Sequence, residues 1–229
     1  MLICPSAGMR WTGTEIGLEG PDEVQVVQKR AHWEAVYLTK PADSVSWFQP
    51  HPGPSLEALE ALELPAGASL IDVGGGASTL VDVLLQRGWT DLSVLDISRA
   101  ALDVVKARLG DQAAGIDWLV ADATSWTPDR TYDVWHDRAL FHFLTQESHR
   151  KAYRHALECA VGQFGHVIIA TFAPDGPERC SGLPVLRYDE QSLAKELGPN
   201  FRLRDHWREE HHTPAGAMQM FTWCLFERV

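Results

Sequence analysis

Two carboxylates in this sequence stand where a ligand can reach both a side chain and bare backbone. Asp72 lies near the end of an apolar run, and only Val73 separates it from a glycine cluster that includes Gly74 and Gly76. Glycine has no Cβ, so a ligand can lie against the backbone there, and a following helix presents free N–H groups. Asp96 ends the next apolar run, 20 residues after Gly76, which is the spacing at which a carboxylate meets a ribose diol. The pattern predicts a nucleotide pocket at the end of the first strand of an open α/β sheet.

The residue three positions after Gly76 separates two kinds of nucleotide ligand. The dinucleotide fingerprint has Gly or Ala there and places a pyrophosphate on the helix N-terminus, whereas this chain has Thr79. A carboxylate beside the loop, Asp72, repels a pyrophosphate but suits a ligand that carries an amine and a sulfonium. A dinucleotide-dependent oxidoreductase is therefore a poorer hypothesis, and the sequence also lacks a Tyr-x-x-x-Lys proton relay.

The order of strand, acid, Gly-x-Gly, helix, strand and acid resembles the first motifs of the class I S-adenosylmethionine-dependent methyltransferases. The resemblance implies S-adenosylmethionine as the cofactor, with Asp72 near its amine and Asp96 on its ribose. It also implies that Asp122, after the third strand, accepts a hydrogen bond from the adenine amine. The cofactor-binding residues expected on this basis are Trp33, Tyr37, Trp47, Asp72, Gly74, Gly76, Asp96, Ile97, Asp122, Ala123 and His136.

Aromatic residues gather in the segment that leads into the glycine cluster. Trp33, Tyr37, Trp47 and Phe48 resemble residues that lie over the cofactor in the thiopurine methyltransferase-like, small-molecule branch of that family. An aromatic face stabilises a cation by about 0.5–2 kcal/mol. The alternative is core packing, which aromatic side chains do more often than anything else.

Titratable side chains crowd the end of the expected fourth strand. Segment 135–140 reads Trp-His-Asp-Arg-Ala-Leu and is similar to the Trp-Asp-Arg-Gly-Ala-Leu signature of the same branch, from which the inserted His136 departs. We expect His136, Asp137 and Arg138 to be catalytic, the first two by taking a proton from the acceptor and Arg138 by orienting an anionic or polar substrate. The structural alternative is an Asp137–Arg138 pair that braces neighbouring loops. His142 lines the pocket or lies on the surface.

The elements that must position these residues alternate between strand and helix. Alternation of this kind implies parallel strands joined by right-handed crossovers. Two strand-like segments near the C-terminus follow each other without a helix and are expected to pair antiparallel. We therefore predict an α/β, Rossmann-like doubly wound sheet of seven strands, mostly parallel with one antiparallel strand near the C-terminus and helices on both faces, as the resemblance also implies. The seven strands are expected at about 68–73, 91–96, 116–121, 131–136, 166–172, 201–208 and 217–227.

The length of 229 residues fits a single domain. Residues 1–54 are expected to form an N-terminal arm, a lead-in helix and a loop that cover the cofactor site, and residues 55–229 the core. Ser55 is expected to cap a short helix at the start of that core.

Composition and charge limit the partners. The net charge of −11 argues against nucleic acid, because phosphate binding needs a basic face. The sequence has no apolar run of about 18 residues, so no membrane span is expected. Four scattered cysteines and a first segment without a basic, apolar leader favour a reduced, cytoplasmic protein. The His211-His212 pair has no suitably spaced ligand partner, so no metal site is expected.

These observations favour an enzyme that transfers a methyl group to an S, N or O atom of a small molecule, as a monomer or homodimer. No Asn/Asp-Pro-Pro-Tyr/Phe motif follows the fourth strand, which argues against base or amide methylation. A protein-lysine N-methyltransferase is the alternative, since Asp137 in an acidic pocket would attract an ammonium. A non-catalytic nucleotide-binding domain is an alternative of another class. The presence of all three acids, Asp72, Asp96 and Asp122, argues against it.

Overall fold

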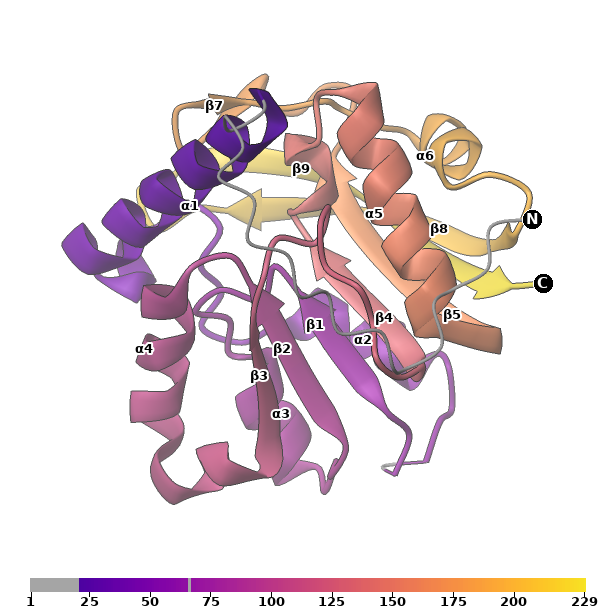
Figure 1. The fold of residues 1–229 in the computed structure, drawn as a ribbon, viewed down its shortest axis with the longest axis horizontal. Helices are drawn as coiled ribbons and strands as arrows, with labels where there is room; N and C mark the ends of the chain where they lie inside the picture. Colours follow the sequence, from indigo (N-terminus) through magenta and orange to yellow (C-terminus); the bar gives the residue numbers. More distant parts are fainter. Residues whose placement is uncertain (1–20, 66) are drawn as a thin grey trace, which may run out of the picture.

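The computed structural model describes residues 21–65 and 67–229, so the expected arm over residues 1–20 lies outside the described residues. A seven-stranded sheet in the order β3-β2-β1-β4-β5-β9-β8 runs through its centre (Figure 1). β9 is antiparallel to both of its neighbours, and the other pairs are parallel. The predicted fold class, with one reversed strand near the C-terminus, is confirmed. The strands are β1 (Leu70–Val73), β2 (Leu92–Asp96), β3 (Ile116–Val120), β4 (Tyr132–Arg138), β5 (Val161–Phe172), β8 (Phe201–His212) and β9 (Met218–Arg228).

Helices cover both faces of the sheet. The sheet packs against α2 (Gly53–Glu60), α3 (Leu80–Gln86) and α4 (Arg99–Leu109) to form one hydrophobic core. It packs against α5 (Glu147–Ala160) and α6 (Glu190–Leu197) to form a second. In Figure 1, α5 lies in front of β4 and β5, while α2 and α3 lie behind the sheet. Because helices cover both faces, the central strands are apolar throughout, and every residue of β1 is buried.

The remaining elements surround the carboxyl ends of the parallel strands. α1 (Pro21–Thr39) crosses these ends at the top of Figure 1. The loop after β5 contains a two-stranded sheet that the sequence did not suggest, formed by β6 (Arg179–Cys180) and β7 (Leu183–Pro184). Within the described residues there are also three short 3-10 helices, η1 (Ala42–Ser44), η2 (Gly110–Gly115) and η3 (Phe141–Phe143). No helix in the described ranges has the length and apolarity needed to cross a bilayer.

Helix ends follow local chemistry where capping residues are present. Ser98 caps α4 by accepting a hydrogen bond from the Ala101 N–H, and the helix ends at Gly110, whose φ is 56°. The expectation for Ser55 is corrected, because α2 already begins at Gly53 behind Pro52. Ser55 therefore lies inside the first turn, and its hydroxyl is free to contact the sheet.

Alternation along β4 decides which core each of its side chains enters. Val134 belongs to the core under α2, α3 and α4, whereas Trp135 belongs to the core under α5 and α6. Successive side chains of a strand point to opposite faces. His136 and Arg138 therefore share the face of Val134, and Asp137 shares the face of Trp135.

Candidate functional site

A pocket lies at the carboxyl ends of β1, β2, β3 and β4, beside α1. It encloses about 780 Å³ of empty space, part of which is open to solvent. The predicted residues in its lining are Trp33, Tyr37, Trp47, Gly74, Asp96, Ile97, Asp122, Ala123 and Arg138. A second pocket adjoins it, and the residues common to both are Tyr37, Trp47, Gly74 and Arg138. Asp72 and His136 line the second pocket only.

Asp96 is fixed in the pocket wall by backbone N–H groups. Its Oδ2 accepts a hydrogen bond from the Gly76 N–H at 2.9 Å and its Oδ1 from the Ser98 N–H at 2.8 Å. An ionised carboxylate has about four acceptor positions, so the two oxygens retain acceptor capacity toward the pocket. Burial raises the pKa of Asp96 to about 7, and the nearby Asp72 and Glu34 charges act in the same direction.

Asp122 carries an acceptor that nothing in the described protein satisfies. Its Oδ1 accepts from the Thr124 N–H at 2.8 Å and from the Thr124 hydroxyl at 2.7 Å. Its Oδ2 is buried and has no hydrogen-bond partner among the described residues. A buried acceptor without a partner is costly, so this oxygen indicates a ligand that donates an N–H or O–H.

The glycine loop is shaped by close approaches. Gly74 has φ 71°, and a Cβ there would lie 2.6 Å from Leu140 Cδ1. Gly76 has φ 54°, and a Cβ there would lie 2.4 Å from the Tyr37 hydroxyl. Larger residues would be strained at both positions and would displace side chains that line the pocket.

The aromatic residues of the lead-in segment pack against one another at the pocket. Trp33 meets Trp47 edge-on, with ring centroids 5.6 Å apart, and meets Phe143 at 5.1 Å. Tyr37 meets Trp47 at 6.3 Å. All four rings line the pocket as well, so core packing and a face toward a ligand are compatible here.

Glu34 attaches α1 to the core. Its two carboxylate oxygens accept from the Arg99 N–H at 2.7 Å and the Ala100 N–H at 3.0 Å, at the N-terminus of α4. Free N–H groups and the helix dipole favour a carboxylate at that position. Glu34 therefore holds the helix that carries Trp33 and Tyr37.

We expect Glu34→Ala to loosen α1 without unfolding the sheet. A capping interaction of this kind contributes about 1 kcal/mol, so amide hydrogen exchange in residues 26–39 is expected to become several-fold faster while that of β1 is unchanged. Glu57→Ala, at an exposed position of α2, is the control and is expected to change neither. Unchanged exchange in α1 after the Glu34 substitution would contradict the assigned attachment.

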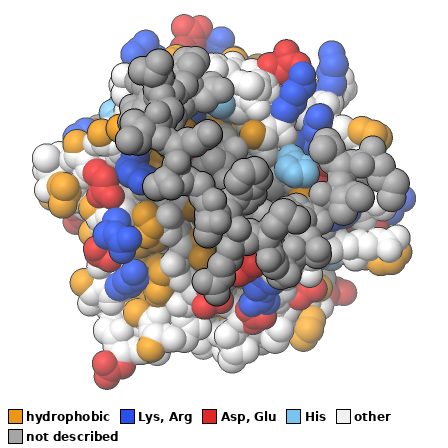
Figure 2. Space-filling model, viewed as in Figure 1, with side chains coloured by type: hydrophobic (Ala, Val, Ile, Leu, Met, Phe, Trp, Pro, Cys, Tyr) orange, Lys and Arg blue, Asp and Glu red, His pale blue; other side chains and the backbone are white. Residues whose placement is uncertain are grey.

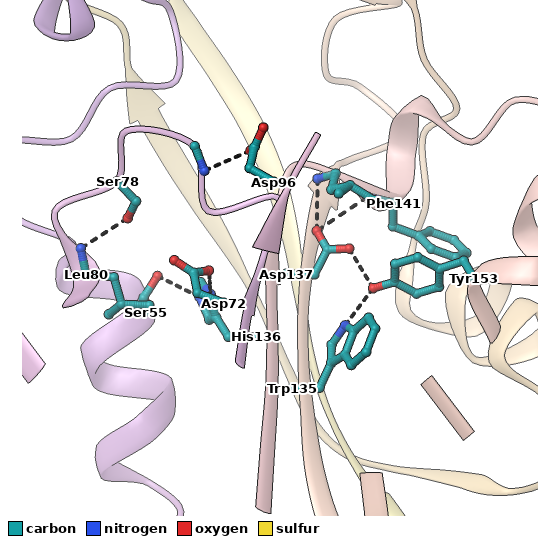
Figure 3. Close-up of polar contacts among 12 residues, drawn as sticks. Ser55, Asp72, Ser78, Leu80, Asp96, Trp135, His136, Asp137, Phe141 and Tyr153 are labelled. Carbon is teal, nitrogen blue, oxygen red and sulfur yellow. Dashed lines mark hydrogen bonds and ion pairs between the residues drawn. The ribbon is translucent and has the colours of Figure 1, made fainter. Parts of the chain in front are cut away.

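His136 is buried within a polar chain on the α2 side of the sheet (Figure 3). Its Nδ1 lies 2.7 Å from Asp72 Oδ1, and its Nε2 lies 3.0 Å from the Ser55 hydroxyl oxygen. The expectation that His136 takes a proton from a substrate does not fit this geometry, because both ring nitrogens have protein partners. Sequence reasoning missed Ser55, since a serine in a first helical turn carries no signal of such a contact.

Asp137 also departs from its expected catalytic role. It is 0% exposed and lines neither pocket. Its Oδ2 accepts from the Tyr153 hydroxyl at 2.6 Å, and its Oδ1 accepts from the Leu140 N–H at 2.8 Å (Figure 3). Burial raises the pKa of Asp137 to about 6, against the opposing effect of these hydrogen bonds. The carboxylate fixes the turn after β4, in which Ala139 has φ 73°, and does not face the pocket.

Arg138 does face the ligand side and keeps unused donors. Its Nη1 donates to the Trp47 carbonyl at 2.9 Å, and its guanidinium lies 5.0 Å from the centre of the Phe221 ring. Nη2 is 3.8 Å from Glu209 Oε1, which is an ion pair without a hydrogen bond. Nε and Nη2 are buried and have no hydrogen-bond partner among the described residues. An acceptor atom of a ligand can therefore bind here.

Burial determines the charge state of two further side chains near the pocket, His142 and Cys180. His142 is fully buried, in neither of its two expected places, and its Nδ1 accepts from the Phe172 N–H at 3.2 Å. Burial lowers the pKa of His142 to about 3. Cys180 lines the pocket, and burial raises the pKa of its thiol to about 11, so the thiol is neutral near pH 7.

Basic and acidic side chains are interspersed on the face shown in Figure 2. A continuous basic surface of the kind that binds nucleic acid is not visible on the described part of that face. Among the described residues, no group of three or more His, Cys, Asp or Glu side chains is arranged to hold a metal ion.

Comparisons with known proteins agree with this geometry. Residues 70–161 match a family model described as a methyltransferase domain. A SAM-dependent methyltransferase from Anabaena variabilis is similar in fold, with a TM-score of 0.70, 13% identity, and 90% of this chain and 95% of that chain covered. The 1,6-didemethyltoxoflavin-N1-methyltransferase of Burkholderia thailandensis, solved with bound 1,6-didemethyltoxoflavin and S-adenosylhomocysteine, has a TM-score of 0.68 and 17% identity, with 94% of this chain and 93% of that chain covered. The N-methyltransferase NodS of Bradyrhizobium japonicum, solved with S-adenosylhomocysteine, has a TM-score of 0.63 and 11% identity, with 86% of this chain and 98% of that chain covered.

Proposed function

We propose, from the methyltransferase domain matched over residues 70–161 and the class I fold around it, that this chain is an S-adenosylmethionine-dependent methyltransferase of small molecules. S-adenosylmethionine is its cofactor. The acceptor atom that we propose is an S, N or O atom, and the branch that we propose is the thiopurine methyltransferase-like, small-molecule one, which the segments 33–48 and 135–140 resemble. One methyltransferase of similar fold is named for a small molecule, 1,6-didemethyltoxoflavin. This similarity supports a small molecule as the acceptor.

The observation that carries the proposal is the placement of Asp96 and Asp122 in one pocket. Asp96 presents a fixed carboxylate at the end of β2, where ribose hydroxyls can donate to it. Asp122 presents a buried oxygen without a partner at the end of β3, and an adenine amine is a donor that satisfies it. Ile97 and Ala123 line the pocket beside these acids. The residues present therefore fit an adenosine.

The protein's own contribution to methyl transfer is mainly one of position. The bound cofactor supplies an activated methyl group on a sulfonium, and its leaving group is a neutral thioether. Arg138 orients the acceptor through its unused N–H donors, and the rings of Trp33 and Trp47 exclude water from the pocket. Holding two reactants in place in this way contributes on the order of 7–11 kcal/mol at best. Among the described residues, His136 and Asp137 are engaged by protein partners and do not line this pocket, so neither is assigned as the base that takes the proton of the acceptor.

The charge at the pocket favours a small molecule over a lysine side chain. The lysine alternative depended on Asp137 as an acidic wall, but that carboxylate is turned toward Tyr153. The charged group that faces the pocket from β4 is Arg138, which repels an ammonium. A non-catalytic nucleotide-binding domain remains the alternative of another class, and turnover decides between the two.

Calorimetry with S-adenosylmethionine, S-adenosylhomocysteine and NAD tests the proposal. We expect micromolar dissociation constants for the two sulfur nucleotides, no heat with NAD, and a rise in melting temperature with either bound ligand. A mass-spectrometric screen of thiol, amine and hydroxyl acceptors with labelled cofactor then identifies the acceptor atom. Absence of binding at saturating concentrations of both sulfur nucleotides would refute the proposal, and binding without turnover on any acceptor would favour the non-catalytic alternative.

A further inference from the structure

Three polar side chains from three elements form a buried chain beside the glycine loop. Ser55 comes from α2, His136 from β4 and Asp72 from β1, and their exposed fractions are 1%, 2% and 3%. Asp72 and His136 are paired in register across adjacent parallel strands, so their side chains project from the same face. Figure 3 shows the imidazole between the carboxylate and the hydroxyl.

The direction of each hydrogen bond follows from the chemistry of its ends. An ionised carboxylate only accepts, so His136 Nδ1 donates its proton to Asp72 Oδ1 over 2.7 Å. In the neutral imidazole, Nε2 is then an acceptor, and the Ser55 hydroxyl donates to it over 3.0 Å. Asp72 thereby sets the tautomer of His136, Ser55 satisfies the remaining ring nitrogen and fixes the ring, and His136 holds one oxygen of Asp72.

The other oxygen of Asp72 is left for a ligand. No hydrogen bond to Oδ2 is found among the described residues, and a Cβ on Gly75 would lie 2.8 Å from it. Asp72, Gly74 and Gly75 line the second pocket, which shares Gly74 and Arg138 with the first. A cationic donor such as a primary amine can therefore approach an oxygen whose orientation is already fixed.

We infer that Ser55 and His136 are positioning residues, which orient Asp72 as the acceptor for the amine of the methionine part of the cofactor. This inference rests on the proposed function. The same order of groups activates the serine of hydrolases, where a substrate must reach the hydroxyl oxygen. Ser55, His136 and Asp72 all line the second pocket. Ser55 is only 1% exposed and its hydroxyl is engaged by His136 Nε2, whereas His136 contacts only Oδ1 of Asp72, so Oδ2 is the atom of this chain that is left for a ligand.

Two ligands that differ in the amino-acid part separate positioning from general support of the fold. S-adenosylhomocysteine carries the amine, and 5′-methylthioadenosine has the same adenosine and thioether without it. We expect His136→Gln to weaken the binding of S-adenosylhomocysteine about tenfold, and Ser55→Ala to weaken it about threefold. Both variants are expected to bind 5′-methylthioadenosine within about twofold of the wild type, because no amine is present to respond. Circular dichroism and thermal melting show whether each variant is folded.

A double-mutant cycle identifies Asp72 as the group through which His136 acts. After Asp72→Asn, the added His136→Gln substitution is expected to have almost no further effect on S-adenosylhomocysteine binding. Equal weakening of both ligands, or an unchanged affinity for S-adenosylhomocysteine in folded variants, would overturn the inference while leaving the proposed function standing. Failure of the wild type to bind either ligand would overturn both. Additive effects in the cycle would show that His136 does not act through Asp72.

Discussion

Replacing Asp137 by alanine is expected to lower the free energy of unfolding by about 3 kcal/mol. The substitution leaves the buried Tyr153 hydroxyl and the Leu140 N–H without their acceptor. Each bond to an ionised group contributes about 1.5–3 kcal/mol, and the cost of burying the carboxylate offsets part of that sum. Urea unfolding followed by circular dichroism measures the change, which should be accompanied by a lower melting temperature.

Three further variants separate this structural role from a catalytic one. Tyr153→Phe removes the bond to Asp137 and also leaves the buried Trp135 Nε1–H without its acceptor, so it is expected to cost about as much as Asp137→Ala. Asp117→Asn, at an exposed position of β3, should have no measurable effect. Turnover is then measured on an identified acceptor, well below the melting temperature. If Asp137→Asn keeps wild-type stability but loses turnover by about 100-fold or more, the carboxylate acts as a base and the assignment made here is wrong.

Replacing Asp96 by alanine is expected to weaken the binding of S-adenosylhomocysteine by about 10–100-fold. Two ribose hydroxyls lose a charged acceptor, and such hydrogen bonds contribute about 1.5–3 kcal/mol. The Gly76 N–H also loses its partner, so the loop that contacts the ligand becomes less fixed. Calorimetry on the folded variant gives the dissociation constant, with Asp117→Asn as the control. A wild-type dissociation constant in a well-folded Asp96 variant would refute the ribose role.

Because the pKa of Asp96 is raised to about 7, the affinity for the cofactor is expected to depend on pH. Ribose hydroxyls donate to the ionised form, so affinity should increase as the pH rises through about 7. If the ligand binds only the ionised form, affinity at pH 5.5 is roughly 30-fold below that at pH 8. Without ligand, the buried carboxyl favours its protonated form, so its contribution to stability is lost as the pH rises toward 7. Asp96→Asn should flatten the affinity profile. A profile that stays steep in this variant would assign the dependence to another group.

Some of this protein is determined by local sequence. Alternating strand and helix patterns fix the order of the parallel strands, because a strand buried on both faces must be apolar and crossovers are right-handed. The spacing from Gly76 to Asp96 brings two adjacent strand ends together, and the structure joins them by a hydrogen bond of 2.9 Å. Asp122 follows by the same argument, since the carboxyl ends of parallel strands meet at one edge of the sheet. The aromatic lead-in segment is equally visible in the sequence as a group of large side chains.

Tertiary structure alone decided what the side chains at the end of β4 do. Their residue types predict a single catalytic group, but a strand sends neighbours to opposite faces, so His136 and Asp137 enter different cores. What each then contacts depends on helices distant in sequence, with Ser55 of α2 reaching His136 and Tyr153 of α5 reaching Asp137. Arg138 is left facing the pocket. Such contacts are set by how the helices pack on the sheet, and no local pattern of charge or hydrophobicity encodes that packing.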